Sequence, residues 1–289
     1  MTPVRFQALD GLELGGALFT PPGGGEPAVV ALLATGGGID FIRYHHFLEY
    51  LAANGIPAFG FDYRGIGASR PATLRNFHAG FEDWSEFDCG GAIAMLQRRF
   101  PRSAIAGIGH SIGGLLLAGA PNAAMLRRVI FVCPHSGYCG DYLPKWRLLM
   151  TLVWHVLAPG IARMVGYFPA RLFRLGNDLP ARVTMQWGSR TTPELNTDVQ
   201  GDPDGRFAAV FRRTTSFAGP AMIVVMPNDG FATEAGIQRL LASMPRLDSV
   251  RMPMIAAGTD PRIQGHWGFF RRRARQACWS MALDYIKGS

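Results

Sequence analysis

The chain has 289 residues, of which 48% are hydrophobic and only 17% charged. This balance excludes intrinsic disorder, because so much apolar surface can offset the entropy cost of ordering the chain. The 36 glycines and 20 prolines follow no period that would indicate a fibrous protein. The formal net charge is +8, but the arginines are scattered apart from the run Arg271–Arg275, which argues against nucleic-acid binding.

The four cysteines lie far apart and form no CxxC pair, which favours a reducing compartment over a disulfide framework. The N-terminal residues alternate like a strand and lack the apolar region of a signal peptide. The longest apolar tract, Leu148–Ala162, includes a histidine and a proline and is too short to span a bilayer. We therefore expect a cytoplasmic protein.

The first half of the chain predicts alternating strands and helices. Val4–Leu9 and Leu12–Phe19 alternate around Asp10-Gly11 and predict a hairpin. Val29–Ala34 is continuously apolar, as in a strand buried on both faces. Further strands are expected at 57–63, 104–109 and 128–133, and helices at 44–54, 84–99 and 111–120. Gly55 follows the first of these helices as a C-cap glycine.

The alternation stops between residues 135 and 217, where helical or irregular patterns predominate and 196–205 resembles an exposed loop. A strand at 221–226, a helix at 234–243, a less regular strand at 249–255 and a last helix at 267–285 follow. Strand–helix alternation predicts an α/β fold with a mostly parallel sheet flanked by helices. We expect residues 1–134 and 218–289 to form the core, and 135–217 to form a helical cap inserted after strand six.

The sharpest chemical signal is the motif GHSIGG at residues 109–114, with Ser111 at its centre. It follows an expected strand and opens an expected helix, which is the context of a nucleophile elbow. Small residues there allow the sharp turn that exposes the serine hydroxyl at the carboxyl edge of the sheet. Ser111 is therefore the candidate nucleophile.

A serine nucleophile needs a histidine base and a carboxylate that orients it. His266 follows the last expected strand and is the preferred base. His135 precedes the later strands, and His155 lies in the apolar cap tract, where packing is the expected role. Asp229 follows the strand at 221–226 and is the preferred acid, with Asp260 as the alternative.

The oxyanion of an acyl-transfer intermediate needs two N–H donors. We expect them from Ile112, directly after the nucleophile, and from Gly37 in the loop Thr35–Gly38. A phosphate cradle is the alternative for this glycine loop, but the loop lacks the lysine of a P-loop and the spacing of a dinucleotide site.

These motifs resemble the serine α/β-hydrolase superfamily, in particular bacterial predicted hydrolases of the lysophospholipase and serine-aminopeptidase-like branch. The resemblance covers most of the chain and includes the elbow, FDYRGIGAS at 61–69, LGNDLP at 175–180 and GHWGFF at 265–270. It implies an α/β-hydrolase fold and places the triad on Ser111, Asp229 and His266. Thr35-Gly36 departs from the His-Gly of many relatives and affects the choice of the second oxyanion donor.

Other residues receive structural or substrate-contact roles. Asp62 and Arg64 are expected to hold the turn after their strand. His45 and His46 are not expected to bind metal, since adjacent helical residues point about 100° apart and no third ligand is near in sequence. For the aromatic and methionine side chains of the cap, packing on the core is the preferred role and an apolar roof over the serine is the alternative; they are Trp146, Met150, Trp154, Met164, Tyr167 and Phe168. His110, Trp154 and Trp267 are the candidate substrate contacts.

The sequence therefore predicts a serine hydrolase without cofactor or metal that cleaves a carboxylic ester or thioester through an acyl-enzyme on Ser111. Acyl transfer or peptidase chemistry on the same triad, and a non-catalytic ligand-binding pseudo-hydrolase, are the alternatives. A dehalogenase would need a carboxylate at position 111. The expected partner is a small acyl substrate with a hydrophobic part. Nucleic acid is not expected, membrane association is not favoured, and a homodimer is an open possibility.

Overall fold

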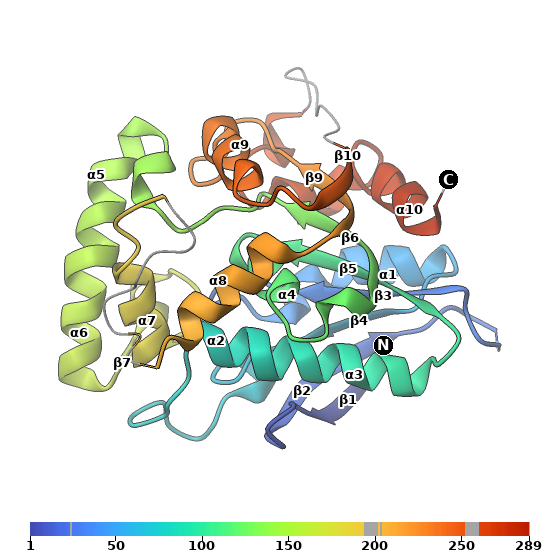
Figure 1. The fold of residues 1–289 in the computed structure, drawn as a ribbon, viewed down its shortest axis with the longest axis horizontal. Helices are drawn as coiled ribbons and strands as arrows, with labels where there is room; N and C mark the ends of the chain where they lie inside the picture. The colour runs from blue at the N-terminus through green and yellow to red at the C-terminus, as the bar shows by residue number, and fades with distance from the viewer. Residues whose placement is uncertain (24, 194–201, 203, 252–259, 289) are drawn as a thin grey trace.

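The computed structural model of the chain describes residues 1–23, 25–193, 202, 204–251 and 260–288. Its centre is an eight-stranded sheet in the order β1-β2-β4-β3-β5-β6-β9-β10. The strands are β1 Thr2–Gln7, β2 Glu13–Phe19, β3 Val29–Ala34, β4 Ala58–Phe61, β5 Ala104–His110, β6 Leu126–Val132, β9 Gly219–Val224 and β10 Leu247–Arg251. This α/β-hydrolase fold, a mostly parallel sheet between helices, is the predicted one (Figure 1).

The first two strands form the expected hairpin, in which Thr2 pairs with Leu18 and Gln7 with Glu13. β2 also pairs antiparallel with β4, whereas the pairs from β3 to β10 are all parallel. The central parallel strands are buried along nearly their whole length, since helices cover both faces of the sheet. Their carboxyl ends therefore meet at one edge, where the loops carry the candidate residues.

Helices pack on both faces of the sheet (Figure 1). On one face α1 contacts α10 through the rings of Phe47 and Trp279, whose centroids are 5.5 Å apart. On the other face lie α3, α4 and α8. The core helices are α1 His45–Ala53, α2 Phe81–Asp83, α3 Gly90–Arg99, α4 Ile112–Ala118, α8 Arg206–Ser216, α9 Glu234–Ala242 and α10 Trp279–Lys287. A π-helical stretch, Trp84–Cys89, joins α2 and α3 into one long helix.

The segment after β6 forms a helical layer at the outer edge of the molecule (Figure 1). It contains α5 Pro144–Leu152, α6 Ala158–Val165 and α7 Ala181–Gly188, with β7 Tyr167–Phe168 paired to β8 Leu179–Pro180. A π-helical turn, Val153–Leu157, makes α5 and α6 one continuous helix. This helix, Pro144–Val165, is long and apolar enough to cross a membrane by length and composition. It is therefore longer than the sequence tract suggested.

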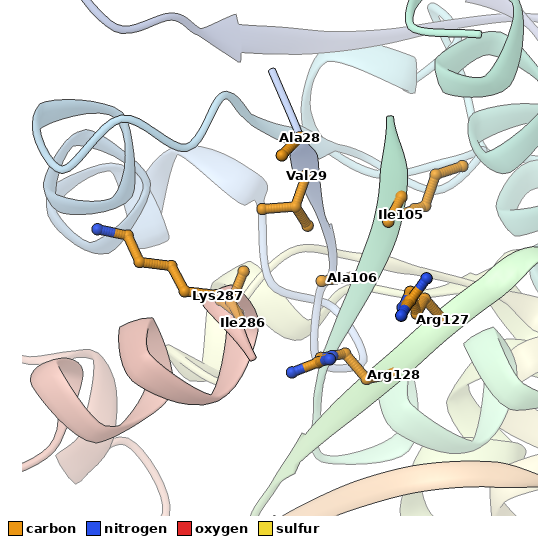
Figure 2. Close-up of a pocket in the computed structure, with 9 residues that line it drawn as sticks. Ala28, Val29, Ile105, Ala106, Arg127, Arg128, Ile286 and Lys287 are labelled. Carbon is orange, nitrogen blue, oxygen red and sulfur yellow. The ribbon is translucent and has the colours of Figure 1, made fainter. Parts of the chain in front are cut away.

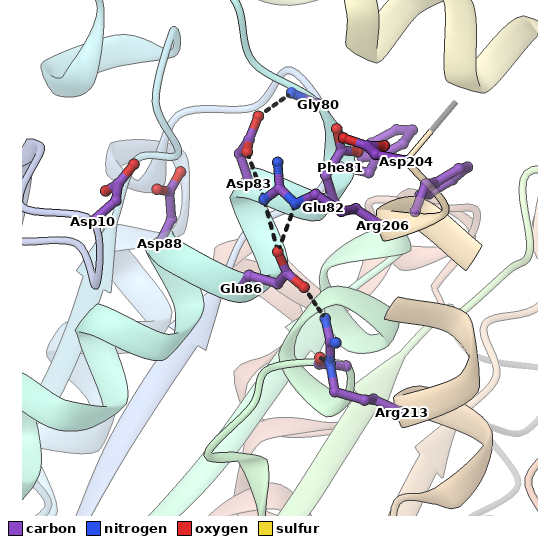
Figure 3. A network of polar contacts seen from close by, with 12 residues as sticks. Asp10, Gly80, Phe81, Glu82, Asp83, Glu86, Asp88, Asp204, Arg206 and Arg213 are labelled. Carbon is purple, nitrogen blue, oxygen red and sulfur yellow. Dashed lines mark hydrogen bonds and ion pairs between the residues drawn. The ribbon is translucent and has the colours of Figure 1, made fainter. Parts of the chain in front are cut away.

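The helix α8, also within the predicted cap segment, packs on the core. Thr214 Oγ1 on α8 donates a hydrogen bond to the carbonyl of Leu115 on α4 (2.9 Å). Arg206 reaches Asp83 (3.0 Å) and Glu86 (2.7 Å), and Arg213 reaches the other oxygen of Glu86 (2.9 Å), as Figure 3 shows. These ion pairs fix the end of the inserted segment to the helix that begins at Phe81.

Most predicted elements are confirmed to within a few residues, and Gly55 adopts the left-handed conformation expected after α1 (φ 88°). The predicted last helix, 267–285, is wrong at its start. Its first half consists of two short 3-10 turns separated by an extended Arg271, and α10 begins only at Trp279. The predicted loop 196–205 and strand 249–255 fall largely outside the described residues.

Candidate active site

Ser111 lies at a sharp turn between β5 and α4. Its backbone has φ 58° and ψ −130°, a conformation that costs free energy for any residue with a side chain. The neighbouring glycines make this turn possible. A Cβ on Gly109 would lie 2.2 Å from the Cα of Gly114, and one on Gly113 would lie 2.3 Å from the carbonyl oxygen of Thr35. Strain is thus held where the sequence predicted the nucleophile elbow.

The side-chain hydrogen bond of Ser111 in this structure joins its Oγ to His135 Nε2 (2.9 Å), not to His266. His135 follows β6, which pairs with β5 so that His110 is opposite Val132. The residues after the two strands are therefore neighbours. Burial, together with the positive charge that His266 can carry, lowers the pKa of His135 to about 3. His135 is consequently neutral at physiological pH.

His266 and Asp229 meet at the same edge, with His266 Nδ1 2.8 Å from Asp229 Oδ2. The other oxygen of Asp229 accepts the backbone N–H groups of Phe231 (2.8 Å) and Ala232 (3.0 Å). Burial by itself would raise the pKa of this carboxyl, but the bond to His266, its charge and the two N–H donors outweigh burial and hold the pKa below its usual range. The ring of His266 lies 5.3 Å from that of His135.

His110 is fully buried, and both of its nitrogens have protein partners. Nε2 lies 2.9 Å from the carbonyl oxygen of His266, and Nδ1 lies 2.9 Å from the hydroxyl of Tyr44. That hydroxyl in turn accepts the N–H of Gly36 (2.9 Å). The chain of contacts ties the loop of His266 to the glycine loop after β3. The structure therefore gives His110 internal partners in place of the predicted substrate contact, because no face of its ring reaches solvent.

The two expected oxyanion donors come close together. A Cβ on Gly37 would lie 3.5 Å from Ile112 Cγ2. Across the described ranges, the N–H groups of Gly37 and Ile112 donate to no protein acceptor, whereas the N–H of Gly36 is used by Tyr44. The arrangement leaves two backbone donors available beside Ser111.

Two aromatic residues that the sequence analysis did not single out border this edge. A Cβ on Gly37 would lie 3.3 Å from Trp187 on α7, whose ring is also 5.8 Å from His135. The ring of Phe231 lies 5.3 Å from that of His266. The sequence could have indicated Phe231, because it lies two residues after the candidate acid Asp229. No sequence signal indicated Trp187, because only tertiary contacts fold α7 over the glycine loop.

The other predicted substrate contacts have different surroundings. Trp154 packs against Trp187, with ring centroids 5.3 Å apart. Trp267 packs on Tyr44 (4.8 Å) and His110 (5.2 Å). Of the predicted apolar roof, Met164 is 81% exposed, whereas the half-exposed Trp146 packs against the loop of Asp229, since a Cβ on Gly230 would lie 2.7 Å from its ring.

The remaining polar candidates have structural partners. Asp260 is exposed and pairs with Arg262 within its own turn (2.6 Å). His155 hydrogen-bonds to the carbonyl of Gly188 on α7. Asp62 accepts the N–H groups of Phe41 and Ala68 (2.7 Å each).

Arg64 forms buried ion pairs with Asp88 and Asp10 (2.7 Å each). Its backbone N–H also donates to Asp88 (2.9 Å). With the bonds of Asp62, these contacts fit the expected role of holding the turn after β4.

Two groups of side chains have metal-ligand spacing. Glu49 lies beside His45 and His46, so the expectation that no third ligand is near in sequence is wrong. However, Arg272 and Arg275 line the same shallow hollow, and two fixed cations oppose binding of a third. In the second group Cys133 stands with Asp229 and His266. Burial and the neighbouring carboxylate raise the pKa of the Cys133 thiol, which opposes the thiolate form that metals bind.

A hollow of about 180 Å³ lies at the opposite edge of the sheet (Figure 2). Val29 and Ile105 line it at the starts of β3 and β5, together with Arg127, Arg128 and Lys287. Arg128 already donates to the carbonyl of Tyr285 (2.5 Å) and stacks on its ring. The hollow is thus at the amino ends of strands whose carboxyl ends carry Ser111, and it belongs to a different part of the molecule.

Comparison with known proteins agrees with this architecture. The family described as serine aminopeptidase S33 matches residues 25–248 of the chain. A soluble variant of monoglyceride lipase from Saccharomyces cerevisiae, solved with a substrate analogue, is similar over 100% of this chain and 96% of its own, with a TM-score of 0.68 and 16% identity. An esterase from Exiguobacterium antarcticum is similar over 99% and 100% (TM-score 0.61, 13% identity), and one from Pyrococcus furiosus over 99% and 91% (0.59, 15%). No curated protein sequence matches significantly.

Proposed function

Because the chain belongs to the serine aminopeptidase S33 family of α/β-hydrolases, we propose that it is a serine hydrolase that cleaves carboxylic esters or thioesters through an acyl-enzyme on Ser111. The observation that carries this proposal is the strained Ser111 at the elbow, at the same sheet edge as the hydrogen-bonded pair His266–Asp229. A serine without a catalytic role could relax to a conformation of lower energy.

In the proposed reaction Ser111 Oγ attacks the acyl carbonyl and forms the new C–O bond, while its proton passes to His266 Nε2. Asp229 accepts from Nδ1 and keeps the basic lone pair on Nε2. The N–H groups of Gly37 and Ile112 stabilise the oxyanion. His266 then gives the proton to the leaving alcohol or thiol, and a water molecule activated by the same histidine releases the acid. The separation of Ser111 from His266 in the resting protein is compatible with this sequence, because catalytic hydrogen bonds often tighten only when substrate binds.

The substrate is expected to be apolar near its acyl carbon. Trp187 stands over the Gly37 loop and Phe231 over His266, and both are aromatic side chains only partly buried by the protein. Such surfaces favour hydrocarbon over charged groups. Peptidase activity is the second candidate, favoured by the match to the serine aminopeptidase S33 family.

The test is labelling with a fluorophosphonate probe, followed by mapping of the adduct and by hydrolysis of p-nitrophenyl esters of increasing acyl length, acyl thioesters and aminoacyl p-nitroanilides. We expect an adduct on Ser111 that Ser111→Ala abolishes, with faster turnover of esters than of anilides. Turnover of anilides alone would replace the esterase proposal by the peptidase. A folded wild-type protein that neither labels nor turns over any of these substrates would refute both and leave a ligand-binding pseudo-hydrolase.

A further inference from the structure

Exposed apolar side chains gather on one part of the cap. Among the described residues 15 large apolar side chains are exposed, and ten of them lie between residues 146 and 175. Three are exposed by 80% or more: Leu148, Met164 and Leu172. Exposed apolar side chains that are grouped in this way mark an interaction site, whereas single exposed residues do not. Trp146 packs against Gly230 and is left out, and we call the other nine the cap surface: Leu148, Leu149, Leu152, Val156, Leu157, Met164, Leu172, Phe173 and Leu175.

The cap surface is not a core face left uncovered. The helix Pro144–Val165 already buries its other side through Trp154, Ala158 and Ala162, which recur at intervals of four residues. In Figure 1 α5 and α6 form the outermost layer of the molecule, with α7 between them and the sheet. The helix is therefore apolar on both its inner and its outer side, and packing within the chain explains only the inner one.

The charges within the segment that carries the cap surface have one sign. Between Tyr142 and Asn177 the sequence contains no acidic residue. Its five cations are all exposed, and within the described residues none makes a direct ion pair, although Arg147 is near enough to Asp141 to interact with its carboxylate. They are Lys145, Arg147, Arg163, Arg171 and Arg174.

We propose that the cap surface docks on a bilayer containing anionic phospholipid, with the helix Pro144–Val165 lying in the headgroup region. Apolar side chains flanked by cations are the pattern of an interfacial helix. The apolar side chains enter the boundary of the acyl chains, and the cations contact the phosphate groups of the lipids. A second copy of the chain fits less well, because a twofold interface through this surface would bring the five cations against five like charges. Sequence analysis did not favour membrane association. The short length of the apolar tract argues against a helix that spans the bilayer, but it does not argue against a helix that lies at the bilayer surface.

The test is co-sedimentation of the full chain with vesicles of phosphatidylcholine, with and without phosphatidylserine. We expect binding to the mixed vesicles that weakens as salt is added. The double variant Leu148→Gln/Met164→Gln should bind at least about tenfold more weakly, and Arg163→Gln/Arg174→Gln about fivefold more weakly per cation removed. The controls Ile42→Gln and Arg98→Gln change exposed residues outside the cap and should bind as wild type does.

Vesicle binding that is absent, or equal in wild type and the cap variants, would overturn the proposal. So would a stable dimer in solution that Leu148→Gln/Met164→Gln dissociates, since the surface would then bind a second copy. None of these readouts uses catalytic activity, and the proposal therefore stands or falls independently of the proposed function.

A second inference concerns His135 and rests on the proposed function. The backbone N–H of Gly137 donates to His135 Nδ1 (3.1 Å), so this nitrogen carries a lone pair. A neutral imidazole then has its proton on Nε2. That nitrogen lies 2.9 Å from Ser111 Oγ. The bond therefore runs from His135 to the serine, and His135 cannot at the same time be the base that removes the serine proton.

We infer that His135 is a further catalytic residue, which donates a hydrogen bond to Ser111 Oγ and keeps its own proton throughout. The donor stabilises negative charge on Oγ when the serine loses its proton, and again when Oγ leaves the acyl group during deacylation. Ser111 remains free to give its proton to His266, whose Nδ1 is held by Asp229. No bond to His135 forms or breaks.

The test compares His135→Gln, which keeps an N–H donor on a side chain of similar reach, with His135→Leu, which removes it. We expect His135→Leu to lower the rates of fluorophosphonate labelling and of deacylation by about ten- to hundredfold, and His135→Gln to recover most of the loss. Nitrogen chemical shifts of the wild-type ring should show the proton on Nε2.

A proton on Nδ1, or labelling of His135→Leu at the wild-type rate, would overturn the inference. Loss of activity in both variants as complete as in Ser111→Ala would make His135 the base and would overturn it too. These results differ from failure of the proposed function, in which the wild-type protein itself would not label.

Discussion

Replacing Asp229 by asparagine tests the proposed role of Asp229 as the acid that sets the tautomer of His266. The two oxygens of Asp229 have different partners: Oδ1 accepts two backbone N–H groups, and Oδ2 faces His266 Nδ1. An asparagine at 229 can satisfy both N–H groups only by placing its carbonyl oxygen at the Oδ1 position. Its amide NH₂ then faces Nδ1 of His266 and must donate to it.

That donation reverses the tautomer of the histidine. His266 would carry its proton on Nε2 and would offer no lone pair to Ser111, while every hydrogen bond of residue 229 would still be made. We therefore expect kcat/KM for a p-nitrophenyl ester to fall by about 10⁴-fold, equivalent to about 5.5 kcal/mol of barrier. The melting temperature should change little, because the packing and the number of hydrogen bonds are kept.

The assay measures ester hydrolysis and thermal unfolding of Asp229→Asn beside Asp260→Asn, the corresponding change at the other candidate acid. Asp260 is exposed and pairs within its own turn, so this control should retain activity within about twofold, as expected of surface changes. Activity of Asp229→Asn within tenfold of wild type would refute the reasoning. A large loss in Asp260→Asn would transfer the role of the acid to that residue.

Three further predictions concern stability. Ser111→Gly should be more stable than Ser111→Ala by about 1 kcal/mol in denaturant unfolding, because glycine adopts φ 58° and ψ −130° without strain; equal stabilities would argue against strain at the elbow. Gly113→Ala should have a free energy of unfolding at least about 2 kcal/mol lower than wild type and should not hydrolyse esters, because its Cβ would lie 2.3 Å from a backbone oxygen. As the control, Gly160→Ala on α6 should be as stable and active as wild type, because a Cβ there meets open space. The folded pKa of His135, about 3, is below its ordinary value of 6.5, so the stability from this neutral group is complete above pH 6.5 and is lost as the pH falls toward 3. Wild type should therefore lose about 1.4 kcal/mol per pH unit more than His135→Gln over that interval, and parallel unfolding curves would contradict a buried neutral histidine.

The case of His135 illustrates what chain order conceals. The order serine, acid, histidine led to His266 and set His135 aside because it precedes the later strands. In space β6 is the neighbour of β5, and parallel pairing brings the residues after both strands to one edge. The strand order would have supplied this signal, but strand order is a property of the sheet and not of any local stretch of sequence.

The last helix shows a second kind of failure. Phe270, Ala274 and Cys278 are spaced as on one helical face, and all three are buried as that spacing predicts. The extended Arg271 nevertheless interrupts the helix, and Trp279 donates to the carbonyl of Phe269 across the break (2.7 Å). Periodicity reported burial correctly, while the backbone path depended on tertiary packing.

The sequence by itself determined the features that arise from local physics: the strands and helices of the core, the glycine-rich turn at Ser111, and the candidate residues that follow strand ends. Each depends on periodicity, or on which residues tolerate a sharp turn, and both can be read within a short window. The tertiary structure alone decided the partners of those residues. It joined Asp229 to His266, turned His110 inward, set His135 on the serine, folded Trp187 over Gly37 and left one side of the helix Pro144–Val165 exposed. These contacts join residues far apart in the chain, and their geometry depends on how the whole sheet and its helices pack.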